Sequence, residues 1–206
     1  MPLPGRRGAP ADWLIVGLGN PGAEYARSRH NVGFMIAELL IERWQLSKPK
    51  RRFKGLLSEG RIGTPGVDTL VRAAVLMPQT YMNDAGRSVG PARGDLRVEL
   101  DQVLVLHDEI DLPFGDIRVR LGGGLAGHNG LKSLKAALGS ADFRRVRIGV
   151  GRPPTTDPDL VAAYVLGKFK QPRDEVQALI DDAADAAERV LDPGAQATSE
   201  SGPGGS

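Results

Sequence analysis

Five residues of the sequence have side chains suited to acid–base chemistry or amide recognition, and all five fall in segments predicted as loops. They are one histidine, one aspartate and three asparagines: His30, Asp108, Asn20, Asn83 and Asn129. Because ligands of an α/β sheet gather at the carboxyl ends of its strands, we expect these side chains to meet there. His30 would act as a general base oriented by Asp108, and the asparagines would supply neutral amides. The set contains no credible nucleophile, which suggests a hydrolase that activates water.

A glycine motif near the N-terminus allows a different function. Gly17 to Gly22 is GLGNPG, which follows a predicted strand and satisfies the dinucleotide-binding pattern G-x-G-x-x-G. Pro21 removes a backbone N–H that a phosphate cradle needs. The acidic residue expected at the end of a second strand is also missing. A nucleotide-dependent oxidoreductase is therefore disfavoured, and NAD binding would test it.

A second motif resembles the nucleophile elbow of α/β-hydrolases. Gly86 to Gly90 is GRSVG and satisfies G-x-S-x-G. An elbow needs a strand that runs directly into the serine, whereas the preceding MPQTYMNDA resembles a loop that enters a helix. We therefore expect Ser88 to be a packed or solvent-facing helical residue. Fluorophosphonate labelling of Ser88 would support a serine esterase instead.

A glycine-rich segment and a concentration of positive charge lie close together in the second half of the chain. GGGLAGHNGLKS, from Gly122 to Ser133, leads into a predicted helix and is not a Walker A motif, because Leu131 follows Gly130. Such a helix N-terminus is suited to an oxyanion or a phosphate. The segment from Gly115 to Arg152 holds eight basic and two acidic residues. This charge favours a polyanionic partner, although a solvated face would show the same composition.

Two arginines of this region occupy alternate positions of a predicted strand. Arg118 and Arg120 should project from one face about 7 Å apart. The apolar residues of the same strand should face the core: Ile117, Val119 and Leu121. Arg147, on another strand, would join the arginines, and three converging cations suit one or two phosphates. The alternative is that they pair with acids of the predicted helix from Asp174 to Leu191.

Strands and helices alternate along the chain. Strands are expected at Trp13–Leu18, Val67–Leu76, Val103–Leu106, Asp116–Leu121 and Val146–Val150. Helices are expected at Asn31–Gln45, Leu131–Leu138 and Asp174–Leu191. This order favours an α/β fold with a mixed sheet between helices.

The composition limits the remaining possibilities. The chain has 206 residues, no cysteine and three histidines, so a Cys-ligated zinc site is excluded and a multi-histidine metal centre is disfavoured. We expect one folded domain at residues 12–191, a disordered leader at 1–11 and a disordered tail at 192–206. Neither a signal peptide nor a bilayer-spanning run is present, which indicates a cytoplasmic protein without membrane association.

Four segments, in order, resemble the bacterial-type peptidyl-tRNA hydrolases. They are LIVGLGNPGAEYARSRHNVGF, LMPQTYMNDAG, LVLHDEIDLPFGDIRVRLGGGLAGHNGL and FRRVRIGVGRP, within a resemblance that runs from about Trp13 to Phe169. The resemblance implies a monomeric single α/β globule built around a mixed, twisted sheet and surrounded by helices. It also implies an enzyme without cofactor or metal. This enzyme would hydrolyse the ester between a peptide and the 3′-terminal ribose of tRNA, and so recycle tRNA after aborted translation.

The same resemblance implies individual roles. His30 matches the catalytic histidine of the family and Asp108 the aspartate that pairs with it. The active-site amides would be Asn20, Asn83 and Asn129, with Tyr25 and Met82 beside them. The residues that hold tRNA phosphate would be Arg118, Arg120 and Arg147. Leu125-Ala126 stands where some members have His-Gly. The alternative is a non-catalytic relative that binds RNA or protein, and cleavage of N-acetyl-aminoacyl-tRNA would distinguish the two.

Overall fold

A mixed sheet of seven strands organises the part of the chain that the computed structural model describes, residues 9–63 and 70–192. The strands lie in the order β2-β3-β4-β1-β5-β7-β6. Their bounds are β1 Trp13–Gly17, β2 Lys50–Arg52, β3 Gly55–Gly63, β4 Leu70–Pro78, β5 Val103–Glu109, β6 Ile117–Leu121 and β7 Arg144–Gly149. β1 is parallel to β4 and β5, and β5 is parallel to β7. The outer pairs β2–β3, β3–β4 and β6–β7 are antiparallel.

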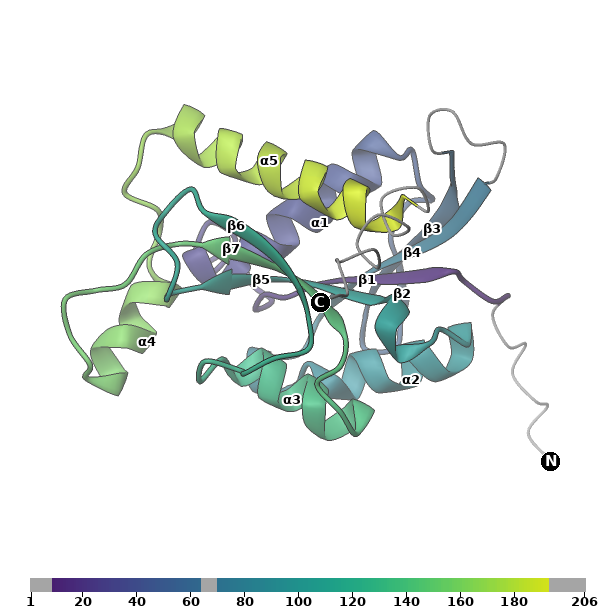
Figure 1. Ribbon diagram of the computed structural model, residues 1–206, viewed down its shortest axis with the longest axis horizontal. Helices are drawn as coiled ribbons and strands as arrows, with labels where there is room; N and C mark the ends of the chain where they lie inside the picture. Colours follow the sequence, from purple (N-terminus) through teal and green to yellow (C-terminus); the bar gives the residue numbers. More distant parts are fainter. Residues whose placement is uncertain (1–8, 64–69, 193–206) are drawn as a thin grey trace, which may run out of the picture.

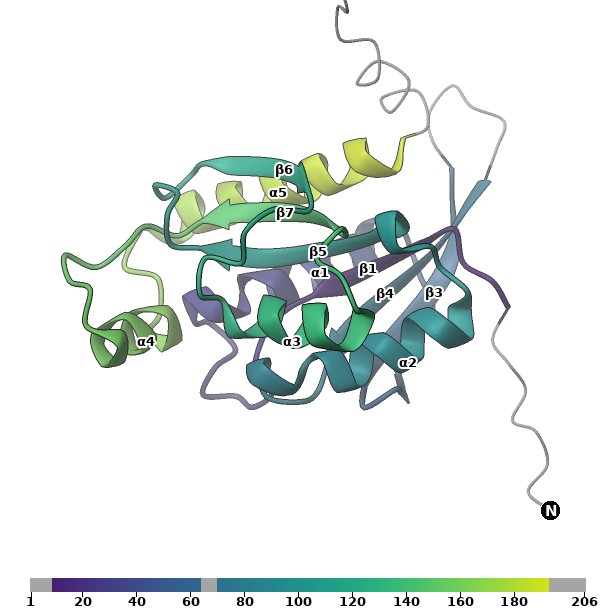
Figure 2. The same cartoon turned by 60° about the horizontal axis from the view of Figure 1, so that its bottom comes forward.

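Within these ranges five α-helices surround the sheet. They are α1 Val32–Arg43, α2 Gly86–Leu96, α3 Asn129–Leu138, α4 Pro158–Leu166 and α5 Arg173–Leu191. α1 and α5 cover one face, and α2 and α3 cover the other (Figure 1). α4 stands apart from both layers at one end of the sheet (Figure 2). The predicted α/β fold, one domain with a mixed sheet surrounded by helices, is confirmed. Over the described residues no helix is long and apolar enough to cross a membrane.

The central strands are apolar along their whole length because helices cover both of their faces. β1 and β5 are buried at every position. Their alternate side chains enter two separate hydrophobic clusters, one under α1 and α5 and one under α2 and α3. The continuous apolar runs that predicted these two strands therefore mark the middle of the sheet.

The prediction for β6 is wrong in one respect. Val119 and Leu121 were expected to face the core, but they are 47% and 52% exposed. β6 is the outermost strand, so it has no neighbour on one side and the helix layer covers little of it. Only Ile117 packs against the core cluster, from a partly buried position. The strand alternates as predicted, but its position at the edge leaves both faces partly open.

Three parallel strands end at the same edge of the sheet. β1 leads into a loop and a 3-10 turn, Arg29–Asn31, before α1. β4 leads into a second 3-10 turn, Met82–Asp84, before α2. β5 ends at Glu109, and the glycine-rich segment after β6 brings the N-terminus of α3 to the same place. The loops that carry the predicted site residues therefore converge. Residues 1–8 of the predicted leader and 193–206 of the predicted tail lie outside the described ranges.

Candidate active site

A cleft of about 620 Å³ opens at this edge of the sheet. Its lining includes all five residues proposed to do chemistry and Met82: Asn20, His30, Met82, Asn83, Asp108 and Asn129. α4 forms part of the opposite wall through Val161 and Val165, among others. Tyr25 is not part of the lining, nor are the three predicted phosphate-binding arginines.

His30 and Asp108 form a direct hydrogen-bonded pair in the cleft. Nδ1 of His30 lies 2.8 Å from Oδ1 of Asp108. Asp108 is almost fully buried, whereas the His30 side chain is 12% exposed. Because an ionised carboxylate only accepts hydrogen bonds, the His30 proton sits on Nδ1. The lone pair of Nε2 then remains to accept a proton, as a general base requires.

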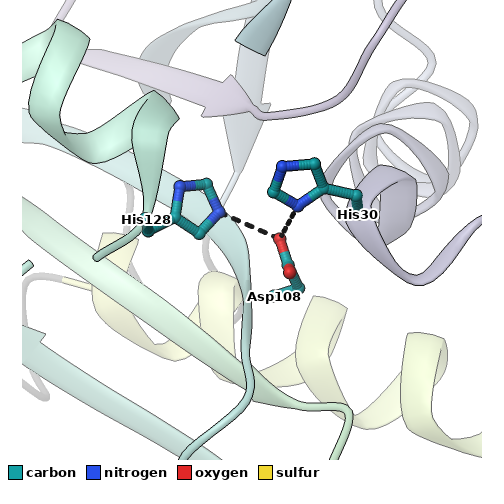
Figure 3. Close-up of side chains that lie close together, drawn as sticks. All are labelled: His30, Asp108 and His128. Carbon is teal, nitrogen blue, oxygen red and sulfur yellow. Dashed lines mark hydrogen bonds and ion pairs between the residues drawn. The ribbon is translucent and has the colours of Figure 1, made fainter. Parts of the chain in front are cut away.

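His128, for which the sequence pattern predicted no role, makes a second hydrogen bond to the same carboxylate oxygen. Its Nε2 lies 2.9 Å from Oδ1 of Asp108, so both histidines converge on one atom (Figure 3). Its Nδ1 accepts the backbone N–H groups of Gly130 and Leu131, at 3.1 and 3.4 Å. His128 is thus the N-cap of α3. A ring that accepts through Nδ1 must carry its proton on Nε2, which fixes a neutral tautomer that donates to Asp108.

The two histidines keep Asp108 ionised. Burial alone would raise the pKa of the Asp108 carboxyl. The hydrogen bonds that His30 and His128 donate, together with the positive charge of either ring whenever it is protonated, outweigh that effect and hold the pKa well below its usual range. An ionised Asp108 is able to stabilise a protonated His30 without taking the proton itself.

The cluster of His30, Asp108 and His128 also has the ligand types of a metal site. One ligand atom from each residue lies within 4.8 Å of the others. A metal bound to Nε2 of His128 would force its proton onto Nδ1. Nδ1 already accepts two backbone N–H groups at the start of α3. The tautomer that caps the helix is therefore the wrong one for a metal, and the arrangement fits proton transfer better.

The third histidine is structural. His107 is fully buried, and its Nδ1 donates to the carbonyl oxygen of Asp108 at 2.8 Å. Its Nε2 has no hydrogen-bond partner. Burial, and secondarily the neighbouring His128, lowers the pKa of His107 to about 3, so the ring is neutral. It packs edge-on against His128, with 5.1 Å between ring centroids, and so supports that ring.

The three asparagines differ in what their amides do. The Asn20 side-chain oxygen accepts the backbone N–H of Met82 at 2.8 Å. The side chain of Asn31 in turn holds the backbone N–H and carbonyl of Asn20, at 2.8 and 2.9 Å. Asn20 thus ties the loop after β1 to the turn after β4. The side chains of Asn83 and Asn129 are exposed in the cleft, so their amides are accessible to a ligand.

Four arginines share one face of the β6–β7 ribbon. Arg118 is paired in register with Arg147, and Arg120 with Arg145. Arg118 is 63% exposed and lies 3.7 Å from Asp116, whereas Arg147 is held at 3.1 Å by Glu109. The alternative that these arginines pair with the acids of α5 is wrong. Among the described residues, three of those acids pair with Arg43 instead: Asp181, Asp185 and Glu188.

Arg145 is a buried arginine to which the sequence pattern assigned no role. Its guanidinium donates to the carbonyl oxygens of Gly122, Gly123 and Gly124, the last at 2.7 Å. Burial, followed by the charges of Arg147 and Arg120, lowers its pKa. The side chain therefore fixes the glycine-rich segment. Arg145 and Arg147 are alternate residues of β7, so their side chains lie on the same face of the strand. This spacing in the sequence could have identified Arg145 as a member of the cluster.

The two glycine motifs that suggested other functions, Gly17 to Gly22 and Gly86 to Gly90, are explained by packing. At Gly17 a Cβ would lie 2.5 Å from the carbonyl oxygen of Gly33, so this glycine permits close contact between β1 and α1. Ser88 is buried within α2, and its Oγ has no hydrogen-bond partner. No strand enters Ser88, because a 3-10 turn precedes α2. The expectation of a packed helical serine is confirmed.

Comparisons with known proteins identify relatives across nearly the whole chain. The model of a family described as peptidyl-tRNA hydrolase matches residues 14–202. A peptidyl-tRNA hydrolase of Bradyrhizobium diazoefficiens is 49% identical over 175 residues, which cover 84% of this chain and 83% of the relative. One of Syntrophotalea carbinolica is 45% identical over 184 residues, or 89% and 92% of the two chains. The crystal structure of peptidyl-tRNA hydrolase from Acinetobacter baumannii superposes with a TM-score of 0.75 at 37% identity, and covers 91% of this chain and 90% of that one.

Proposed function

The chain belongs to the peptidyl-tRNA hydrolase family, and from this premise we propose how its cleft performs the reaction. The enzyme hydrolyses the ester that joins a peptide to the 3′-terminal ribose of tRNA. An ester carbonyl is reactive enough that an activated water suffices as the nucleophile. The observation that carries the proposal is the 2.8 Å hydrogen bond from His30 to Asp108, which leaves Nε2 of His30 unprotonated.

His30 removes a proton from the attacking water, and Asp108 stabilises the imidazolium that forms. General base catalysis of this kind contributes about 10²–10⁴-fold. The proton then passes from His30 to the ribose oxygen as the ester bond breaks, which returns the imidazole to its neutral form. His128 is a positioning residue. Its hydrogen bond keeps the carboxylate of Asp108 ionised and limits its rotation.

Asn83 and Asn129 are proposed to bind the ester oxygen and the peptide backbone through their accessible amides. An amide that donates to the developing oxyanion contributes about 10²–10³-fold. Asn20 positions the loop of Met82, and Met82 forms an apolar wall of the cleft. A pocket of neutral amides and an apolar wall disfavours a charged α-amino group. Selection of N-acylated peptides over ordinary aminoacyl-tRNA follows from this. Tyr25, which lies in the loop after β1, is proposed to support the pocket from outside the cleft.

The RNA is proposed to lie over β6 and β7. Arg118 and Arg120 are exposed there and are not committed to strong ion pairs. Arg147 lies beside them, although Glu109 partly neutralises it. This cluster would clamp phosphates near the tRNA terminus and orient the ester over His30. We further propose that the enzyme acts as a monomer in the cytoplasm and needs no cofactor.

Incubation of the protein with N-acetyl-aminoacyl-tRNA, with and without a chelator, tests this function. Release of free tRNA and N-acetyl amino acid at equal rates in both conditions is the expected result. Binding of tRNA without release would favour the non-catalytic relative. A rate that the chelator abolishes and added metal restores would show that the reaction depends on a metal ion.

A further inference from the structure

One buried carboxylate of the catalytic cleft takes no part in the reaction described above, that of Glu109. It follows Asp108 at the end of β5 and lines the cleft, and its side chain is 4% exposed. A buried charge is stable only when it is paired and hydrogen-bonded. The partners of Glu109 therefore indicate its role.

The two carboxylate oxygens of Glu109 have different partners. Oε1 accepts the backbone N–H of Asp111 at 3.1 Å, in the turn that follows β5. Oε2 accepts the Nε and Nη2 donors of Arg147, at 3.2 and 3.1 Å, across from β5 to β7. The backbone of the turn thus holds the carboxylate, and the carboxylate holds the guanidinium.

Other cations surround the guanidinium of Arg147. Arg118 is its partner in register on β6, and Arg145 is the alternate residue of β7. Burial lowers the pKa of Arg145 most, the charges of Arg147 and Arg120 lower it further, and Glu109 acts in the opposite direction. Within the described ranges Glu109 is the one carboxylate that pairs with Arg147. Without it, repulsion by its neighbours would drive the Arg147 side chain away from the cluster.

The pair leaves Arg147 able to bind a ligand. An arginine presents five N–H groups in a rigid fork. Glu109 accepts two of those of Arg147, which leaves three, and the Arg147 side chain is 19% exposed. Arg118 differs, because its side chain is 63% exposed and Asp116, 47% exposed, lies 3.7 Å away. Arg147 is therefore held in one orientation, whereas Arg118 is held loosely.

We propose that Glu109 is a positioning residue for the RNA, which holds the guanidinium of Arg147 in the orientation that binds a phosphate of the tRNA. This inference rests on the proposed function, in which Arg147 belongs to the phosphate clamp. An arginine that is oriented before the RNA arrives loses less rotamer freedom on binding. Glu109 thereby strengthens the binding of a polyanion although its own charge is negative.

The direction of one effect separates this role from simple charge repulsion. If charge alone mattered, removal of a carboxylate beside an RNA-binding face would tighten RNA binding. Glu109→Gln should instead weaken it, because an amide has one accepting oxygen and cannot hold both Arg147 and the N–H of Asp111. The Kd for deacylated tRNA and the KM for N-acetyl-aminoacyl-tRNA should both rise about fivefold, the effect of about one hydrogen bond, and kcat should change less than about twofold.

Asp116→Asn is the matched control, since it removes an exposed carboxylate beside the loosely held Arg118. It should lower Kd and KM by up to about twofold, opposite in direction to Glu109→Gln. A second comparison combines Glu109→Gln with Arg147→Gln. Because no guanidinium remains to be oriented, the double variant should bind tRNA no more weakly than Arg147→Gln alone.

Thermal melts show whether the variants are folded at the assay temperature. If Glu109→Gln is not, Glu109→Asp takes its place, because it keeps the charge, is too short to reach Arg147 and should also raise Kd and KM. An affinity for tRNA equal to or tighter than that of the wild type in these variants would overturn the proposal. So would an Arg147→Gln enzyme with wild-type affinity, or an equal loss from Glu109→Gln with and without Arg147. Failure of the wild type to release tRNA from N-acetyl-aminoacyl-tRNA would refute the proposed function alone, since Kd is measured without the reaction.

Discussion

Nε2 of His128 lies 2.9 Å from Oδ1 of Asp108, the same oxygen that accepts the hydrogen bond of His30. The backbone at the start of α3 sets the direction of this bond, because two N–H groups occupy the other ring nitrogen of His128. The N-terminus of α3 thus fixes the tautomer of His128. The hydrogen bond that this tautomer donates holds the carboxylate of Asp108, and the carboxylate in turn orients His30. The glycine-rich segment before α3 is held by Arg145 and so contributes to the same arrangement.

His128→Asn should separate the two roles of His128. Asparagine is as good an N-cap as any residue, so α3 and the melting temperature should be preserved. Its side chain is too short to reach Asp108, so kcat should fall about tenfold. His128→Ala should lose the cap as well, which costs about 1 kcal/mol of stability. Thermal melts and steady-state kinetics of both variants provide the measurement. Equal kcat for His128→Asn and wild type would show that the second hydrogen bond does not matter.

Asp108→Asn should lower kcat at least about 10²-fold, because an amide can present its N–H₂ group to His30 and select the wrong tautomer. Steady-state kinetics of the variant and the wild type measure this loss. A kcat close to the wild-type value would mean that the two side chains do not interact in the working enzyme.

His107 should make the protein sensitive to acid. Its folded pKa is about 3, whereas an unfolded histidine has a pKa of about 6.5. Between these values the unfolded state binds a proton that the folded state does not. The free energy of unfolding should therefore decrease by up to about 1.4 kcal/mol per pH unit as the pH falls from about 6.5 to about 3.

His107→Asn removes this titration and retains an N–H group that can donate to the Asp108 carbonyl. Its stability should depend less on pH over that interval than that of the wild type, as urea unfolding at several pH values would show. The low pKa of Asp108 acts in the same direction but only below about pH 4, where an unfolded carboxyl begins to bind protons. Parallel stability curves for wild type and variant above pH 4 would contradict the assignment.

Arg118→Gln combined with Arg120→Gln should raise KM for peptidyl-tRNA and leave kcat nearly unchanged. The slope of log(kcat/KM) against log salt should fall by about one for each lost phosphate contact. The matched control is Arg61→Gln with Arg189→Gln, two exposed arginines on β3 and α5. A short substrate without the clamped phosphates should react equally with both double variants. Loss of kcat on both substrates, with an unchanged salt slope, would show that the cluster supports the fold.

Much of the site could be predicted because its residues lie at the ends of strands that the sequence marks clearly by continuous apolar runs. The continuous apolar run of β5 ends beside Asp108, and the run of β1 precedes the loop of Asn20 and His30. Parallel strands bring such ends together, so position along the chain implied proximity in space.

Three features could not be predicted from the spacing of residues in the sequence: the role of His128, the exposure of Val119 and the helix α4. His128 precedes a predicted helix, but the direction of its ring is set by hydrogen bonds to Gly130 and Leu131 and by a carboxylate twenty residues earlier in sequence. The exposure of Val119 depends on β6 being an edge strand, which its alternation does not reveal. α4 was missed although Asp157 followed by Pro158 is a helix-start signal, because its mostly apolar sequence shows no amphipathic pattern.

The most direct test of the catalytic assignment is His30→Ala, with kcat measured on N-acetyl-aminoacyl-tRNA and affinity measured by tRNA binding at the same salt concentration. Removal of the general base should reduce kcat at least about 10²-fold, because no other described side chain in the cleft has an unprotonated nitrogen placed to replace it. The tRNA dissociation constant should stay within about twofold, since the arginines of β6 and β7 are untouched. A His30→Ala enzyme that keeps a near-wild-type kcat would contradict the account.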